Sequence, residues 1–253
     1  MADRGMPEEV PWWSPKALVD RELEIRSGTD VADIRNDFAS YKALLHGLTE
    51  AESGLYMHNE FEPWRVNVVC RDYATLVGRD KTHDPLVIAD FGCGAGFTTD
   101  GLQRTWPFAR VTGFDVSVDA IQYARSRWTR CTFVDGIIVP SQQLAGGPFN
   151  LLVCQQFYPF TRTGSIIVHQ EWLGCLLNNM SKEGLAIITL AASTRDSIND
   201  TYTDLRREFK LSRVQIAAQR ISRRLPFPMS RAVAVLLRDV RPGWVRNLYV
   251  LQH

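Results

Sequence analysis

The sequence lacks long apolar runs, paired cysteines and a secretion signal. No stretch of its 253 residues approaches the roughly 20 consecutive apolar residues that a membrane-spanning helix needs. The first ten residues are polar and acidic, unlike the basic and then apolar start of a signal peptide. The five cysteines are an odd number without a Cys-x-x-Cys pair, which argues against a disulfide framework and a zinc site. We therefore expect a cytoplasmic protein with no membrane segment and no metal.

The sequence also has almost no net charge, although its charges are unevenly distributed. The formal net charge is +1, which argues against a dedicated nucleic-acid binder. Residues 1–84 carry a net −6, residues 85–194 carry zero, and residues 195–253 carry +7. These divisions coincide with the structural divisions predicted below, so we expect attraction between head and tail within one domain rather than an anionic partner.

What the sequence does contain is an alternation of short apolar runs and amphipathic segments, which is typical of a parallel sheet crossed by helices. Strands are predicted at 85–90, 110–115, 131–135, 149–154 and 184–190, and helices at 96–106, 118–128 and 164–180. Later strands are predicted at 214–218 and 245–251. Residues 202–209 are predicted to be helical, as are residues 230–240, with Ser230 as N-cap; a strand is the alternative for 230–240. With 45% hydrophobic residues, the chain can bury one core of ordinary size.

Two further helices are predicted before this core, at 29–48 and 64–78. They belong to no strand–helix–strand unit, so we expect them to cap one end of the sheet. The predicted organisation is therefore an N-terminal helical lid or cap at 1–84 and one decorated α/β domain at 85–253.

The most informative segment is Asp90-Phe-Gly-Cys-Gly-Ala-Gly96, which follows the first strand. Glycines let backbone N–H groups approach a ligand, and the next helix adds its positive N-terminal end. The spacing Gly-x-Gly-x-Gly differs from the dinucleotide fingerprint, and Asp90 would repel a pyrophosphate but suits an ammonium group. A tight turn in an unrelated α/β protein is the alternative.

Two more acidic residues end the second and third strands. Asp115 lies where a carboxylate can accept hydrogen bonds from both hydroxyls of a ribose, and Asp135 can accept from an adenine amine. Taken singly, either residue is equally well explained as a helix cap or turn aspartate. A ligand that has an ammonium, a ribose diol and an adenine amine but no phosphate is S-adenosylmethionine.

These residues resemble the Rossmann-like class I S-adenosylmethionine-dependent methyltransferases from about Leu86 to Leu190. The family's first motif is matched by Asp90–Gly96, its second-strand acid by Asp115 and its third motif by Asp135. The resemblance implies a seven-stranded, mostly parallel sheet with a reversed last strand, helices on both faces, and methyl transfer as the default activity. The expected cofactor-binding residues are Asp90, Gly92, Cys93, Gly94, Gly96, Asp115, Val116, Asp135, Gly136 and Gln155.

The loop after the fourth strand occupies the family's acceptor-facing position. It lacks the Asp/Asn-Pro-Pro-Tyr sequence of the enzymes that methylate amino groups of adenine, cytosine or glutamine, which counts against a nucleic-acid substrate. We expect Gln156, Phe157 and Phe160 to contact an acceptor and Tyr158 to take part in catalysis. The alternative is that these aromatic residues pack the loop onto the core.

Titratable candidates flank this loop. His169 has an ordinary pKa near 6.5 and is a candidate general base, together with Glu171 at the start of the same helix. The alternative for both is a solvated first turn. In similar methyltransferases a segment like Glu52–Glu60 contributes to the acceptor pocket, so Tyr56, His58 and Glu60 are further candidates; an ordinary interhelical loop is the alternative.

Three functions fit these observations. The leading hypothesis is methyl transfer to a small molecule in specialised metabolism, by in-line displacement with catalysis mainly by proximity. The second uses the same cofactor for aminopropyl transfer or cyclisation. The third is a macromolecule-directed enzyme whose basic tail docks on RNA or on an acidic carrier protein. The sequence does not indicate the oligomeric state.

Overall fold

A computed structural model describes residues 63–78, 86–115, 118–136, 138–157, 160, 166–189, 205–206, 208–238 and 245–252. Within these residues no helix is long and apolar enough to cross a membrane. The predicted helix at 29–48 lies outside the described residues. The helix predicted at 64–78 is present as α4 (Pro63–Val77), but the expectation that it caps one end of the sheet is wrong, because it packs on a face of the sheet. The division at residue 84 therefore stays a prediction.

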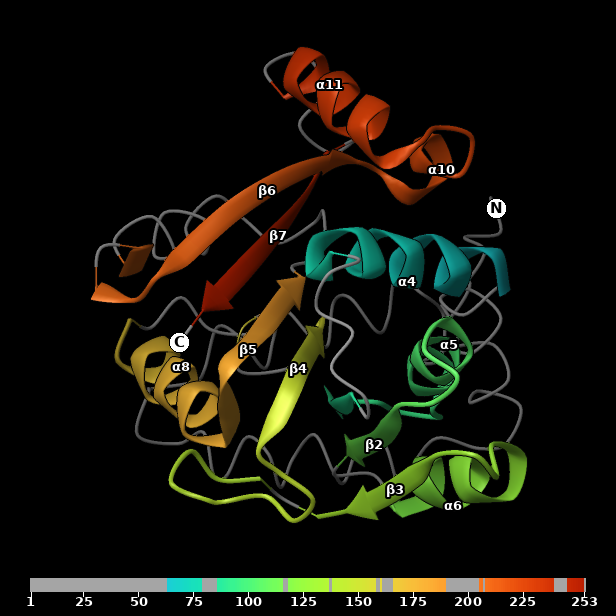
Figure 1. Cartoon of the computed structure of the whole chain (residues 1–253), viewed down its shortest axis with the longest axis vertical. Helices are drawn as coiled ribbons and strands as arrows, with labels where there is room; N and C mark the ends of the chain where they lie inside the picture. The colour runs from blue at the N-terminus through green and yellow to red at the C-terminus, as the bar shows by residue number, and fades with distance from the viewer. Residues whose placement is uncertain are drawn as a thin grey trace, which may run out of the picture. The chain divides into compact units, whose positions relative to one another are not determined.

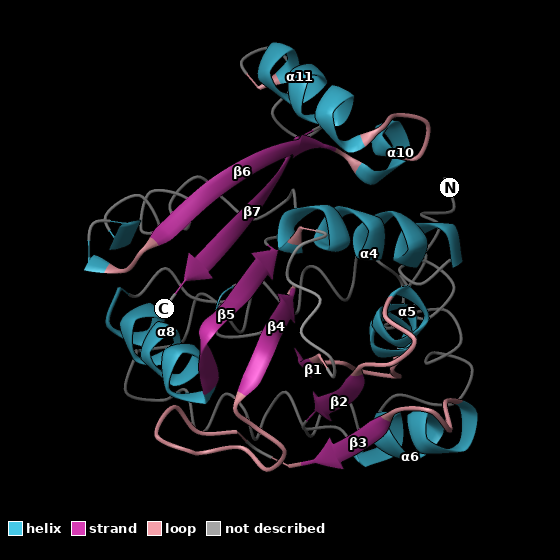
Figure 2. Ribbon diagram, in the orientation of Figure 1, coloured by secondary structure: helices cyan, strands magenta, loops and turns pink. Residues whose placement is uncertain are grey.

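The described part is a seven-stranded sheet in the order β3-β2-β1-β4-β5-β7-β6 (Figures 1 and 2). Its strands are β1 (Val87–Phe91), β2 (Arg110–Asp115), β3 (Thr132–Asp135), β4 (Phe149–Gln155), β5 (Met180–Thr189), β6 (Leu211–Ala217) and β7 (Val245–Gln252). The first five strands pair in parallel, whereas β7 runs antiparallel to both β5 and β6. This confirms the predicted mostly parallel sheet with a reversed last strand.

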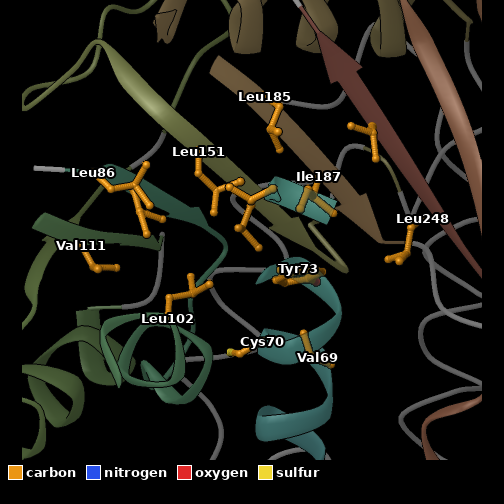
Figure 3. Close-up of a cluster of buried hydrophobic side chains, with 14 of the residues drawn as sticks. Val69, Cys70, Tyr73, Leu86, Leu102, Val111, Leu151, Leu185, Ile187 and Leu248 are labelled. Atoms are coloured by element: carbon orange, nitrogen blue, oxygen red, sulfur yellow. The ribbon is translucent and has the colours of Figure 1, made fainter. Parts of the chain in front are cut away.

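The helices α4 (Pro63–Val77), α5 (Phe97–Thr105) and α6 (Val118–Arg127) accompany the first three strands, and α8 (Ile166–Asn179) follows β4. Figure 3 shows α4 and α5 against one face of the sheet, where Tyr73 and Leu102 pack on Leu151 and Ile187. Phe91 points to the opposite face and meets Phe157, whose ring in turn contacts Trp172 of α8. Side chains alternate along each strand, so a strand can contact helices on both faces of the sheet. In this sheet α4 and α5 cover one face and α8 covers the other.

Two helices follow β6: α10 (Gln219–Ser222) and α11 (Phe227–Leu237). A helix was one of the two predictions for this region, but the expected N-cap is wrong. The N-cap is Pro226, and another proline, Pro228, lies in the first turn, where its missing N–H costs nothing. Ser230 is instead buried inside α11, and its hydroxyl lies 2.6 Å from that of Ser222.

A buried ion pair and a hydrogen bond join α4, in the acidic N-terminal part of the chain, to β7 and α10 in the basic tail. Arg246 of β7 donates to Asp72 of α4 at 2.6 Å, with the two side chains only 7% and 1% exposed. Arg71 contacts the other carboxylate oxygen at 3.1 Å and also donates to the carbonyl of Ser222 in α10. Through these contacts α4 is fixed to β7 and α10.

Candidate active site at the carboxyl edge of the sheet

The acidic residues that were predicted from strand spacing lie at one edge of the sheet. Because β1, β2 and β3 are parallel and adjacent, their carboxyl ends meet there. Asp90 pairs in register with Gly113, and Asp115 with Asp135. Within the described residues, this edge carries the glycine loop and the ends of β1 to β4.

The glycine loop is held by backbone hydrogen bonds and uses left-handed glycines. Gly92 and Cys93 both donate to the carbonyl of Phe114, at 2.8 and 3.1 Å. Gly92, Gly94 and Gly96 have φ angles of 69°, 52° and 80°, a region that residues with a Cβ rarely enter. The sequence folds into this turn because three glycines are available at alternate positions.

The three glycines differ in what surrounds them. A Cβ on Gly92 would lie 3.0 Å from the ring of Phe157, and one on Gly96 would lie 2.7 Å from the ring of Phe133. A Cβ on Gly94 would meet no atom within 4 Å. Gly92 and Gly96 therefore allow close packing of the protein on itself, whereas Gly94 faces open space that a ligand can fill.

Asp115 lies directly against this open position. Its Oδ2 accepts a hydrogen bond from the backbone N–H of Gly94 at 2.8 Å. The contact fixes one carboxylate oxygen beside the glycine loop, as binding of a ribose diol between loop and carboxylate requires. The residues present therefore fit an adenosyl ligand that has no phosphate.

Asp90 lies beneath the loop and is almost completely buried, with 1% of its surface exposed. The hydroxyl of Thr99 in α5 donates to its Oδ2 at 2.7 Å. The pKa of Asp90 is raised from 3.8 to about 7: burial raises it most, the hydrogen bond from Thr99 lowers it, and the charge of Asp115 raises it. A carboxyl group with this pKa gains from a cationic neighbour, so the expected contact with an ammonium group stays a prediction with a physical basis.

Asp135 has a partner that the sequence did not suggest. Arg125 of α6 donates to Asp135 Oδ1 at 2.8 Å and also to the carbonyl of Phe133. The Asp135 side chain remains 37% exposed. The next residue, Gly136, donates its N–H to the Asp115 carbonyl at 3.0 Å, which ties the ends of β2 and β3 together. The predicted contact of Asp135 with an adenine amine stays a prediction.

Cys93 donates its backbone N–H within the loop, and its thiol donates to the carbonyl of Gly94 at 3.6 Å. Its thiol is buried and points to the position that a Cβ on Gly113 would take, 2.8 Å away. Burial raises the pKa of this thiol well above its ordinary value, and the charges of Asp115 and Asp90 raise it further. A neutral, enclosed thiol is poorly suited to nucleophilic chemistry.

The end of β4 is fixed from three sides. The hydroxyl of Thr98 donates to Gln155 Oε1 at 3.2 Å. The N–H of Gln156 donates to the carbonyl of Thr189 at the end of β5, at 3.0 Å. Phe157 closes on Gly92 as described above. Gln156 itself is exposed and has φ 54°, a conformation that costs a residue with a side chain about 1–2 kcal/mol.

A buried tyrosine supports the same turn and was not predicted as part of the site. Tyr73 of α4 is 0% exposed, and its hydroxyl lies 2.8 Å from Thr189 Oγ1. The sequence placed Tyr73 only on the apolar face of a helix. A buried tyrosine needs a partner for its hydroxyl, and that requirement is the signal that was available.

Phe157 and Phe160 lie in the core, with 7% and 1% exposure. Their ring centroids are 6.2 Å apart, and that of Phe157 lies 5.0 Å from that of Trp172. This packing is the alternative that the sequence left open for the aromatic loop. Contact of these rings with an acceptor stays a prediction.

His169 and Glu171 do not face the same surroundings. His169 is 0% exposed, with its ring 5.8 Å from that of Phe160, whereas Glu171 is exposed. Two residues apart on a helix, the side chains point in nearly opposite directions. A catalytic role for either stays a prediction. Val116, Tyr158, Tyr56, His58 and Glu60 lie outside the described residues.

Comparisons with known proteins agree with this geometry. A family model described as "Methyltransferase domain" matches residues 88–176. Trans-aconitate 2-methyltransferase from Rhodopseudomonas palustris is 47% identical over 63 residues, which cover 25% of each chain. The Escherichia coli protein of the same name is 36% identical over 91 residues, covering 36% of this chain and 34% of that relative. The chain thus matches about a third or less of the length of these curated relatives.

Solved structures share the fold at low sequence identity. The plantazolicin methyltransferase BpumL, in complex with a pentazolic desmethylPZN analog and SAH, superposes with a TM-score of 0.56 at 14% identity. That match covers 92% of this chain and 99% of the other. A TehB-like SAM-dependent methyltransferase from Corynebacterium glutamicum gives 0.52 at 17% identity, covering 81% and 99%. Residues 88–176 thus match a methyltransferase domain, and the sheet has the fold of these solved methyltransferases.

Proposed function

We propose that the protein transfers a methyl group from S-adenosylmethionine to a small-molecule or peptide-derived acceptor. The observation that carries this proposal is the open position at Gly94 with the Asp115 carboxylate fixed beside it. When bound, S-adenosylmethionine supplies an electrophilic methyl group on a sulfonium. The contribution of the protein is to bind the adenosyl part at the ends of β1 to β3 and to hold an acceptor in line.

The described residues support catalysis by positioning. Asp90, Asp115 and Asp135 come from three adjacent strands, so they are fixed relative to one another by the sheet. The exposed Gln156 is held at the same edge by its bond to Thr189. Holding reactants in a rigid, favourable geometry supplies a large part of the rate in such displacements. Tyr158, Tyr56 and His58 remain proposed acceptor contacts from the sequence.

The acceptor class rests on the relatives. The matched curated proteins are named for trans-aconitate, a small carboxylic acid, and the structural neighbour for plantazolicin. Both names agree with an acceptor other than nucleic acid. The specialised-metabolism setting is part of the same proposal.

Isothermal titration with S-adenosylhomocysteine tests the cofactor part. Asp115→Ala should weaken binding by about 10- to 100-fold, because it removes charge-assisted hydrogen bonds worth about 1.5–3 kcal/mol. Asp100→Ala is the matched control: Asp100 lies in the first turn of α5, and its carboxylate pairs with Arg104. We expect that variant to bind like the wild type. Equal binding by wild type and Asp115→Ala would refute the assigned site.

The reaction itself is tested on the spent cofactor. After incubation with candidate acceptors, including trans-aconitate, mass spectrometry should detect S-adenosylhomocysteine. Accumulation of 5′-methylthioadenosine would instead show that the aminopropyl carbon is attacked and would overturn methyl transfer.

A further inference from the structure

Helix α11 lies at the same edge of the sheet as the candidate active site. Since β5 and β6 both run antiparallel to β7, they end on the same side, toward which β4 also points (Figure 1). Thr189 pairs with Leu248, and Ala217 pairs with Val245, three residues closer to that edge. At about 3.4 Å per residue, β6 therefore ends about 10 Å beyond the end of β5. Helix α10 follows β6 directly, and Ser230 of α11 contacts the last residue of β6, Ala217.

The orientation of α11 on the sheet is fixed by buried contacts. Phe227, Ser230 and Ala234 face the body of the protein, with 8% exposure or less. The Ser230 hydroxyl accepts from the N–H of Ala217 at 3.2 Å, and that of Ser222 donates to the Ala217 carbonyl at 2.7 Å. The outward face of α11 is therefore defined by these contacts.

That outward face is apolar. Met229 is 53% exposed, Val235 55% and Leu236 75%, and Ala232 between them is also exposed. Met229, Ala232 and Leu236 are spaced by three and four residues, which places them on one helical face. A surface helix ordinarily presents polar side chains to water, so a helix that is apolar on both faces indicates a binding surface.

The segment that carries this face is strongly basic. Residues 218–238 contain five arginines and no aspartate, glutamate or lysine. Arg223 lies over the Trp64 ring of α4, 5.0 Å from its centroid, and Arg224, Arg231 and Arg238 are exposed. An occupant of the apolar face thus meets positive charge along its border.

The charge and the side-chain types of this surface decide which occupant fits best. A second copy of this chain paired through a twofold axis would bring arginine borders toward one another, which is unfavourable. Proteins that bind single-stranded RNA combine basic residues with aromatic side chains on which the bases stack, and the outward face of α11 carries aliphatic side chains instead. A helix that lies in a membrane surface carries its basic residues on the face opposite the apolar one, whereas that face of α11 packs on the protein through Phe227, Ser230 and Ala234.

We propose, in contrast to the expectation that the basic tail attracts only the acidic head of the same chain, that the outward face of α11 docks an acidic polypeptide through an apolar helical surface, at the edge where the acceptor must enter. Such a partner is a carrier that presents the acceptor, or an acidic segment of a peptide acceptor. The placement beside the acceptor rests on the proposed function, whereas the docking surface itself rests only on the exposure and charge of α11.

The test uses the full chain and a fluorescein-labelled helical peptide of about 18 residues, with leucine on one face and glutamate on the other. Fluorescence anisotropy should show binding that weakens as salt increases. A peptide with lysine in place of glutamate should bind about tenfold or more weakly. Equal binding of the two peptides would overturn the proposal.

Matched variants locate the surface. Leu236→Ser and Arg231→Glu should each weaken binding about tenfold or more. Phe108→Ser and Arg130→Glu make the same changes in the turns before β2 and β3, at the opposite edge of the sheet, where Phe108 is 83% exposed. These controls should bind within about twofold of the wild type. Unchanged binding by Leu236→Ser with an unchanged melting temperature would overturn the assignment.

The rival occupants are measured with the same variants. Cosedimentation with phosphatidylglycerol vesicles would identify a membrane surface as the partner, retention of a single-stranded RNA would identify RNA, and self-association in the ultracentrifuge would identify a second copy of the chain. Any of these results, if it is lost in Leu236→Ser, would overturn the acidic polypeptide as the partner. S-adenosylhomocysteine titration should be unaffected by Leu236→Ser. If the peptide binds while the wild type fails to bind S-adenosylhomocysteine, the proposed function fails and the docking surface stands.

Discussion

Gly94 and Gly96 share a left-handed backbone, but a methyl group at each would meet different surroundings. Gly94→Ala should cost about 1–2 kcal/mol of unfolding free energy, because only the backbone is strained. Gly96→Ala should cost about 3 kcal/mol or more, because its Cβ also collides with Phe133 and Trp128. Urea denaturation measures both.

Gly94→Ala, the variant that should cost less stability, should be the one that weakens ligand binding. Among variants that fold, Gly94→Ala should lose about tenfold or more in S-adenosylhomocysteine affinity, because its methyl group occupies the open position. A Gly94→Ala protein that binds like the wild type would show that the ligand does not approach this glycine.

Asp90 should make stability depend on pH. Because burial raises its pKa from 3.8 to about 7, the folded protein holds this proton more tightly than the unfolded chain does. The free energy of unfolding should therefore fall as the pH rises from about 4 to about 7, by at most about 4 kcal/mol, and then level off. Asp90→Asn should remove this component of the slope in urea denaturation at a series of pH values.

The same group should link ligand binding to pH in the opposite sense. An ammonium group beside Asp90 needs the carboxylate form, so S-adenosylhomocysteine should bind more tightly as the pH rises through about 7. Titration in buffers of different ionisation enthalpy should show proton release. In Asp90→Asn both effects should vanish; if they persist, Asp90 does not contact the ammonium.

At the scale of elements, the side chain of Tyr73 connects α4 to the carboxyl end of β5. Tyr73→Phe removes the hydroxyl that contacts Thr189, whose carbonyl holds the N–H of Gln156. The loss should cost about 1–2 kcal/mol and speed hydrogen exchange of the Gln156 amide about tenfold. Tyr123→Phe, the same change on α6, is the control and should leave that amide unchanged.

The link between α4 and β7 depends on a buried ion pair. Arg246→Met should cost about 3–5 kcal/mol, because it removes the β7 partner of the Asp72 carboxylate, which is only 1% exposed. Replacing both partners, in Asp72→Leu/Arg246→Met, should restore part of the loss. Arg104→Met breaks the half-exposed pair with Asp100 and should cost about 1 kcal/mol or less. Calorimetry distinguishes these outcomes.

For the whole molecule, the sequence predicted the sheet because the relevant signals are local. The apolar runs before Asp90, Asp115 and Asp135 predicted strands β1 to β3 to within two residues at either end. The N-terminus of α11 was missed because Ser230 is a good N-cap residue in isolation. Its buried bond to Ser222, eight residues away, depends on the tertiary fold.

The candidate site was predictable only in part, for the same reason. The glycine loop and its acids are encoded within single segments and their spacing. The partners Thr99, Arg125 and Tyr73 come from helices, and the sequence does not state which strand end each helix reaches. The separation of His169 from Glu171 was visible in principle, since a two-residue spacing on a helix divides faces.

The position of β7 in the sheet determines when the sheet can be completed during translation. It is the last of the seven strands along the chain, yet it fills the place between β5 and β6. While a ribosome is still translating residues before Val245, β5 and β6 have unpaired edges facing each other across a missing strand, and open edges invite pairing with other chains. A nascent chain must therefore keep the two edges apart until β7 has been synthesised, when this strand closes the sheet and brings Arg246 to Asp72.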